Sequence, residues 1–215
     1  MRYLYCLLLL LAGTPYTMAQ TDEKTSVFNE MSTSNEAYLV KDWSNGVVRF
    51  SGGRILTEPK LRFNCVQNLL MLQFKGTEFA AQGKIIEFVL YVKRGKTTDS
   101  MLFRKEYPAI DQQNSETYYQ VLTSGKATLL KLHLKVLREE RSIIGGSNVN
   151  RKLEDDKAYY LLKDNTMILL PQERNKIAEK FGDQSVAIAQ FINTQQLKLH
   201  TDEDFIAVVK KYNEL

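Results

Sequence analysis

Between residues 37 and 170 the chain repeats one pattern, in which short apolar or alternating segments are separated by turn-forming residues. In the clearest segment, Leu130, Leu132, Leu134 and Val136 alternate with Lys131, His133, Lys135 and Leu137. Alternation with a period of two places the two sets of side chains on opposite faces of a β-strand. About ten such segments occur, so the sequence predicts an antiparallel sheet built from local hairpins.

Turn residues indicate where the hairpins close. Asn45-Gly46 lies between two apolar segments and predicts a tight two-residue turn. Further turns are predicted at Gly52-Gly53, Gln67-Asn68, Gly76, Gly95 and Asp164-Asn165. The segment from Ile143 to Asp156, which contains Gly145-Gly146-Ser147-Asn148, is predicted to be a loop before the last hairpin. A meander, an open barrel and a sandwich-like arrangement all fit this series of strands.

After Pro171 the spacing of apolar residues changes to that of helices. Ile177 and Phe181 fit a short helix that ends at Gly182, and residues 186–192 fit a second. Thr201 and Asp204 resemble a helix N-cap, and an apolar stripe follows at Phe205, Val208, Val209, Tyr212 and Leu215. The predicted fold class is therefore α+β, with an antiparallel β domain at 37–170 and about three short helices at 171–215 packed on the sheet.

The first nineteen residues predict an exported protein. Arg2 precedes an apolar run from Leu4 to Gly13, and Thr17-Met18-Ala19 resembles a small-residue cleavage signal. The run has about half of the roughly 20 residues that a helix needs to cross a bilayer, so we expect no transmembrane span in the mature chain. We predict a signal peptide at 1–19 and, from the polar composition that follows, a flexible leader at 20–36. The expected location is periplasmic or extracellular.

Charge and cysteine content exclude some classes of protein. The formal net charge of +4 becomes +3 when Arg2 is removed with residues 1–19, which is too small to predict nucleic-acid binding. Cys65 is then the only cysteine of the mature chain, so no intramolecular disulfide is expected. Because Cys65 alternates in register with Leu61 and Phe63, we predict a buried structural thiol and not a nucleophile.

No sequence motif identifies a reaction. His133 and His200 lack the spacing of metal ligands and are expected at the solvated surface. The chain also lacks a Gly-x-Ser-x-Gly turn and a glycine-rich phosphate loop, so we predict no metal and no cofactor. The favoured interpretation is a non-enzymatic binding or structural protein of the cell envelope. The alternative is an exported hydrolase whose site is assembled from scattered residues.

One group of residues is a candidate binding site, namely the cationic stripe of Lys131, His133, Lys135 and Arg138. Such a stripe could contact an anionic ligand on an envelope glycan, lipid or protein. Lysines on an outward strand face more commonly keep a sheet soluble and unpaired. If the stripe binds an anion, changing Lys131 and Lys135 to Glu abolishes retention on anionic envelope components.

Four further segments form a distinctive set: Asp42-Trp43-Ser44-Asn45-Gly46-Val47-Val48, Lys60-Leu61-Arg62-Phe63-Asn64, Tyr159-Tyr160-Leu161-Leu162-Lys163-Asp164 and Val209-Lys210-Lys211-Tyr212-Asn213. This set resembles the pattern of small exported proteins of unknown function that are common in Bacteroidota. The motifs occupy expected turn and strand positions, so the resemblance implies a shared fold and transfers no catalytic or binding residue. It also implies the periplasm or the exterior of a two-membrane bacterium as the compartment.

Overall fold

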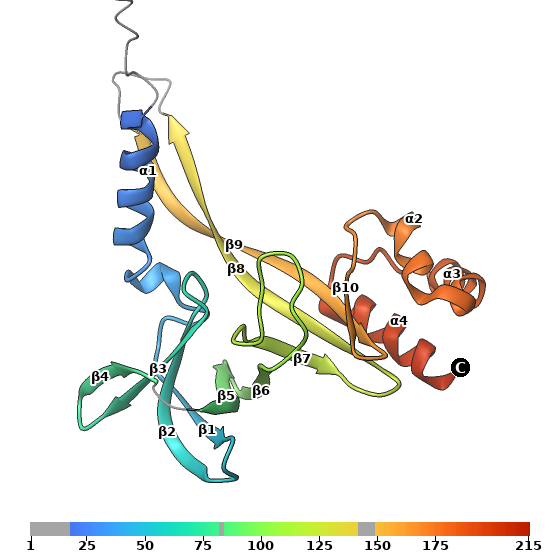
Figure 1. Ribbon diagram of the computed structural model, residues 1–215, viewed down its shortest axis with the longest axis horizontal. Helices are drawn as coiled ribbons and strands as arrows, with labels where there is room; N and C mark the ends of the chain where they lie inside the picture. The colour runs from blue at the N-terminus through green and yellow to red at the C-terminus, as the bar shows by residue number, and fades with distance from the viewer. Residues whose placement is uncertain (1–17, 82–83, 142–148) are drawn as a thin grey trace, which may run out of the picture.

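The computed structural model describes residues 18–81, 84–141 and 149–215 (Figure 1). Its strands are β1 (Ser44–Phe50), β2 (Ile55–Asn64), β3 (Leu69–Phe74), β4 (Thr77–Ala80), β5 (Ile85–Arg94), β6 (Thr97–Arg104), β7 (Tyr119–Thr123), β8 (Ala127–Arg141), β9 (Val149–Lys163) and β10 (Thr166–Leu169). Its helices are α1 (Met18–Met31), η1 (Asn35–Ala37), α2 (Arg174–Ile177), η2 (Ala178–Gln184), α3 (Ser185–Thr194) and α4 (Asp202–Glu214). The predicted α+β class, with an antiparallel sheet followed by short helices, is confirmed.

The ten strands form one open sheet in the order β10-β9-β8-β7-β6-β5-β1-β2-β3-β4. Most neighbours in the sheet are also neighbours in the sequence, as expected for a meander. The exception is β1, which lies between β5 and β2 and pairs with both. The N-terminal strand therefore joins two hairpins that would otherwise be separate.

The N-terminal half of the sheet, β1–β6, curls around an aromatic core. Phe63 of β2 and Phe103 of β6 have ring centroids 4.9 Å apart, although their strands are three positions apart in the sheet. Three strand spacings in a flat sheet amount to about 14 Å, so the sheet is strongly curved here. Phe88 stacks on Phe103, and the Tyr118 hydroxyl donates a hydrogen bond to the Ile85 carbonyl at 2.8 Å.

In the C-terminal half, β7–β10, separate elements cover both faces of the sheet. On one face, Leu129 and Leu161 pack against the helices, where Ile188, Phe205 and Val209 are buried. On the opposite face, Leu130, Leu132 and Tyr160 share a core with Tyr107, which lies in the connection between β6 and β7. Figure 1 shows the helices beside β8 and β10.

The predicted turn at Asn45-Gly46 is wrong, because both residues lie inside β1. Gly46 allows a close approach there, since a Cβ atom built on it would lie 2.2 Å from the Val89 carbonyl oxygen. The pair therefore serves strand packing and does not form a turn. The other predicted turns are confirmed by positive φ angles at Gly53, Asn68, Gly76, Gly95, Asp164 and Asn165.

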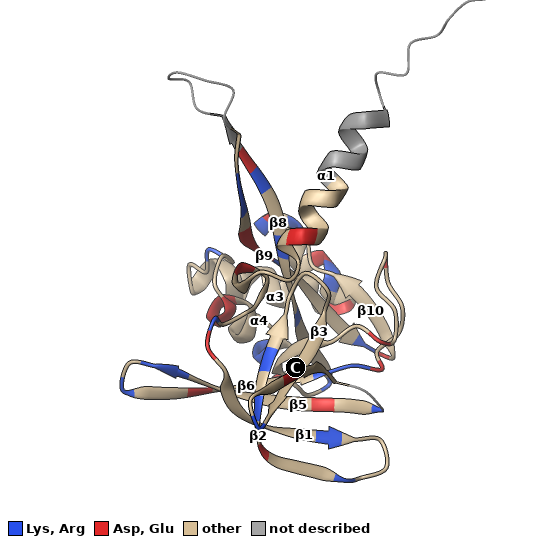
Figure 2. Cartoon of the chain, turned by 90° about the vertical axis from the view of Figure 1, so that its left-hand side faces the viewer, with Lys and Arg blue, Asp and Glu red and all other residues tan. Residues whose placement is uncertain are grey.

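Part of the predicted loop from Ile143 to Asp156 is also a strand. Residues 142–148 lie outside the described residues, but β9 begins at Val149. The β8–β9 register runs without a shift from Arg141↔Val149 to Ala127↔Lys163. Since β7 pairs with β8 only at 129–131 and β10 pairs with β9 only at 160–163, residues 132–141 and 149–158 form a two-stranded extension, here called the arm (Figures 1 and 2).

The segment expected as a flexible leader at 20–36 contains all of α1 except its first two residues, and the beginning of η1. Its polar composition suggested that it could not order itself, but β2 supplies partners from a distance. The Asn64 side chain donates to the Ser32 carbonyl at 2.8 Å, and Arg62 donates to Asn35 at 2.8 Å. The predicted signal peptide at 1–19 lies almost entirely outside the described residues. Among the helices that the structure describes, none is long and apolar enough to cross a membrane.

Candidate functional site

A polar cavity of about 660 Å³ lies between the aromatic core and the helix-covered half of the sheet. Its walls come from the segment before β1, from β5 to β9, and from the first turn of α4. The lining residues are Leu39, Val40, Arg94, Asp99, Ser100, Met101, Gln120, Lys131, His133, Asp155, Asp156, Lys157, Asp202 and Glu203. Two residues of the predicted cationic stripe, Lys131 and His133, therefore face a cavity and not open solvent.

His133 lines this cavity between Phe103 and Gln120, so its predicted position at the solvated surface is wrong. Its ring lies 5.7 Å from that of Phe103, and Nε2 is 2.7 Å from Gln120 Oε1. Burial, assisted by nearby Lys131, lowers the pKa of His133 from 6.5 to about 4. The imidazole is therefore neutral at pH 7, and with Gln120 Oε1 as acceptor its Nε2 carries the proton.

Lys131 is held by the N-terminus of α4. Its Nζ contacts both carboxylate oxygens of Asp202, at 3.0 and 2.9 Å, and its side chain is only 13% exposed. The Tyr159 hydroxyl donates to the same carboxylate at 2.5 Å. Burial acts to raise the pKa of Asp202, but the hydrogen bonds from Tyr159 and Lys131 outweigh it and lower that pKa. Burial, together with the hydrogen bond to Asp202, raises the pKa of Tyr159, so this hydroxyl stays protonated.

The predicted stripe does not form one cationic surface. Lys135 lies on the same face of β8 as Lys131 and His133, and it pairs with Asp155 at 2.6 Å. Arg138 has the opposite parity along the strand, so it lies on the other face, where it pairs with Glu154 at 3.4 Å. The cations Lys131, Lys135 and Arg138 are thus each matched by a carboxylate from β9 or α4.

The balance of charge around the cavity is acidic. The lining includes five carboxylates, Asp99, Asp155, Asp156, Asp202 and Glu203, against three cations, Arg94, Lys131 and Lys157. Because the imidazole of His133 is neutral, it adds no positive charge at pH 7. The cavity therefore offers many hydrogen-bonding groups with a slight excess of negative charge.

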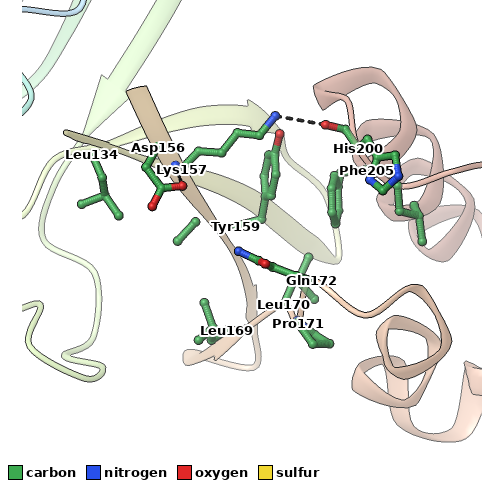
Figure 3. Close-up of a pocket in the computed structure, with 12 residues that line it drawn as sticks. Leu134, Asp156, Lys157, Tyr159, Leu169, Leu170, Pro171, Gln172, His200 and Phe205 are labelled. Carbon is green, nitrogen blue, oxygen red and sulfur yellow. Dashed lines mark hydrogen bonds between the residues drawn. The ribbon is translucent and has the colours of Figure 1, made fainter. Parts of the chain in front are cut away.

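A second cavity of about 530 Å³ adjoins the first, and Asp156 and Lys157 line both (Figure 3). Its walls are mainly apolar and include Leu134, Leu169, Leu170, Pro171 and Leu199. Tyr159 and Phe205 stack in its wall with ring centroids 4.1 Å apart. Lys157 Nζ donates to the His200 carbonyl at 3.0 Å and so links β9 to the segment before α4.

Cys65 is buried beside the aromatic core, as predicted. Burial raises the pKa of its thiol to about 12, which keeps it protonated and unreactive. Within residues 18–81, 84–141 and 149–215, no group of three or more His, Cys, Asp or Glu side chains is placed to hold a metal ion.

Sequence reasoning missed three residues of the site, Gln120, Tyr159 and Asp202. Tyr159 and Gln120 are brought beside Lys131 by strand register, since Lys131 pairs with both. Asp202 had no predicted role of its own, although it lies between Thr201 and Asp204, the two residues of the predicted N-cap. The sequence feature that could have located Asp202 is the predicted cap at Thr201, because the cap fixes where α4 begins.

Comparisons with protein-family models, with curated proteins and with solved structures found no match. The geometry of the two cavities is therefore the basis for a functional proposal.

Proposed function

We propose that the chain is an exported, non-enzymatic binding protein of the cell envelope, and that the polar cavity binds a neutral or amino-bearing glycan. The observation that carries this proposal is the convergence of Gln120, Lys131, His133 and Asp202 on one cavity of about 660 Å³. That volume falls in the range of small-ligand pockets, which combine apolar walls with a few placed polar groups. Here Leu39, Val40 and Met101 supply the apolar wall.

The charge of the cavity favours such a ligand over an anion. Lys131 is neutralised by Asp202, and His133 is uncharged at pH 7. An anionic ligand would have to approach an excess of carboxylates, whereas hydroxyl or amino groups can donate hydrogen bonds to them. The anionic-ligand hypothesis for Lys131, His133, Lys135 and Arg138 remains a prediction, and the experiment below includes it.

The hydrogen bonding of the site supports binding over hydrolysis. Hydrolysis by a covalent route needs a nucleophile within hydrogen-bond reach of a base. The partner of His133 Nε2 is the amide oxygen of Gln120, and the Cys65 thiol is protonated. The exported hydrolase stays the alternative, with no observation of this site that favours it.

Calorimetric titration with three soluble probes of matched length tests the proposal. We use chitosan oligosaccharides as the amino-bearing probe, N-acetylated chitin oligosaccharides as the neutral probe, and oligogalacturonates as the anionic probe. We expect binding of the amino-bearing or the neutral probe, and a loss of about tenfold or more in affinity for Gln120→Ala, because one buried polar partner is removed. Gln190→Ala, which changes an exposed amide on α3, is the matched control and keeps the affinity of the unmodified protein.

Two results would contradict the proposal. Exclusive binding of oligogalacturonate, lost in the Lys131→Glu/Lys135→Glu variant, would support the anionic-ligand hypothesis instead. Glycan binding that Gln120→Ala leaves unchanged would place the site outside the polar cavity.

A further inference from the structure

Among the described residues, no strand pairs with the outer edge of β9 along the arm. In the sheet, β9 pairs with β8 on one side, and on the other side β10 pairs with it only at 160–163. Leu170 N donates to the Tyr159 carbonyl at 2.8 Å, which shows that the backbone of Tyr159 faces this outer side. Because backbone direction alternates along a strand, the N–H and C=O groups of Asp155, Leu153 and Arg151 face the same side.

The charges along this edge are antisymmetric about one residue. Arg151 and Lys152 precede Leu153, and Glu154 and Asp155 follow it. In a strand that pairs antiparallel with a copy of itself centred on Leu153, Arg151 lies opposite Asp155 and Lys152 lies opposite Glu154. The first pair lies on one face of the new sheet and the second pair on the other. Figure 2 shows the alternating bands of basic and acidic residues on the arm.

We propose that two copies of this chain associate through the β9 edges of their arms, antiparallel and with the two-fold axis at Leu153. Such an interface is isologous, since the same residues contribute from both copies. In each residue pair whose backbones face each other, the two residues exchange both N–H···O bonds. The two open sheets become one continuous sheet across the interface.

The charge pattern selects this register over its neighbours. Moving the centre by one residue, to Glu154, places Glu154 opposite Glu154 and Arg151 opposite Lys157. Moving it to Lys152 places Lys152 opposite Lys152. Like charges directly opposite one another destabilise a strand pair, so the register centred on Leu153 is the one in which opposite charges meet throughout.

Contacts within the arm are compatible with this pairing. Lys152 already contacts Glu154 at 3.0 Å on its own strand, and Arg151 contacts Glu139 of β8 at 3.2 Å. Cross-edge pairing places a further carboxylate near each cation and does not require the contacts within the arm to be released. Lys157 N donates to the Asp156 side chain at 2.8 Å, which caps the edge there and confines the pairing to about residues 151–155.

The Lys152–Glu154 pair of the interface lies outside the proposed glycan site, although Asp155 of the other pair lines the polar cavity. Lys152 and Glu154 line neither cavity, and both side chains are about two-fifths exposed. Variants at these two positions therefore test association without altering the polar cavity. Association can also be measured with no glycan present, so the two proposals can fail separately.

Sedimentation velocity of the purified protein, from micromolar to millimolar concentration, tests the interface. We expect a reversible monomer–dimer equilibrium that weakens with salt, because the pairs are partly exposed. Lys152→Glu alone and Glu154→Lys alone each raise the dissociation constant about tenfold or more, since each places like charges opposite one another on both sides of the axis. An equimolar mixture of the two variants forms a heterodimer, because Glu at 152 of one copy then faces Lys at 154 of the other.

Two controls keep the outcome decisive. The double exchange Lys152→Glu/Glu154→Lys restores complementarity within one sequence and recovers dimers. Lys176→Glu on α2 makes the same change in net charge as Lys152→Glu, away from the arm, and leaves association unchanged. A protein that stays monomeric up to millimolar concentration overturns the proposal. Single variants that dimerise as well as the unmodified protein, or a mixture that fails to form the heterodimer, would also overturn it.

Discussion

In β1–β6 the sheet covers its own inner face, because it curls until Phe63, Phe88 and Phe103 meet in one cluster. In β7–β10 the same face is covered by another layer, the helices that contribute Ile188, Phe205 and Val209. The polar cavity lies where the first arrangement gives way to the second. A change in how a sheet is covered thus leaves a gap, and in this protein polar side chains line that gap.

The largest expected effect comes from removing one aromatic ring from each half. Phe63→Ala and Phe181→Ala each remove a fully buried side chain and cost about 3–5 kcal/mol of the free energy of unfolding. We expect amide hydrogen exchange to accelerate in β1–β6 for Phe63→Ala and in the C-terminal helices for Phe181→Ala. Acceleration spread equally over both halves in each variant would show that the two cores do not open separately.

His133, at the boundary between the two halves, is expected to make the free energy of unfolding depend on pH. Because its pKa is lowered from 6.5 to about 4 in the folded state, the unfolded state binds the proton more tightly. The contribution of His133 to the free energy of unfolding is fully present above pH 6.5 and is lost as the pH falls toward 4. The loss over this range amounts to about 3 kcal/mol. Urea unfolding measured across this range is expected to show that loss, and His133→Gln removes it.

His200→Gln is the matched control for this experiment, since His200 is exposed before α4. It leaves the pH dependence of the unmodified protein intact. The same loss of stability between pH 6.5 and 4 in the His133→Gln variant would assign it to other groups, such as carboxylates of the cavity.

The aromatic half also depends on close strand packing at Gly46. A Cβ atom there would lie 2.2 Å from the Val89 carbonyl oxygen, which is backbone and cannot move aside. Gly46→Ala is expected to lower the free energy of unfolding by about 1–3 kcal/mol. Gly52→Ala, where a Cβ would meet nothing within 4 Å, is the control and stays near the unmodified value. Equal stability of the two variants in urea unfolding would contradict the role assigned to Gly46.

The contrast between Gly46 and Asp164-Asn165 shows what local sequence could predict. Both sites carry residues that favour positive φ, but only Asp164 and Asn165 adopt it, at 49° and 56°. At Gly46 the need for a small residue comes from β5, a strand far along the chain. Alternation and turn residues thus predicted the number of strands and most hairpins, because those signals are local. They could not predict that β1 inserts between β5 and β2.

The candidate site was less predictable than the strands, because it also depends on contacts between segments far apart in the sequence. The sequence indicated that Lys131, His133 and Lys135 share one strand face, which is correct. Their environment depends on Gln120 and Asp202, which approach from β7 and α4. Gly145-Gly146-Ser147-Asn148 suggested a loop that runs on to Asp156, but the fifteen-residue register with β8 makes 149–156 part of a strand. Charge complementarity between strands is a tertiary property, and a single strand does not reveal it.

The smallest expected effect comes from the N-cap of α4, the helix whose first turn lines the polar cavity. Thr201 caps α4 by accepting a hydrogen bond from Asp204 N at 3.3 Å, and Asp202 follows in the first turn. Thr201→Ala removes this acceptor and is expected to cost about 1 kcal/mol, measured by thermal unfolding. Thr201→Ser keeps the hydroxyl and serves as the control. Because the cap fixes where α4 begins, Thr201→Ala is also expected to loosen the Asp202–Lys131 contact and to weaken the proposed glycan binding. The Phe63 cluster is expected to keep its hydrogen-exchange protection. Weakened protection of that cluster would show that the helical layer supports the curled half as well.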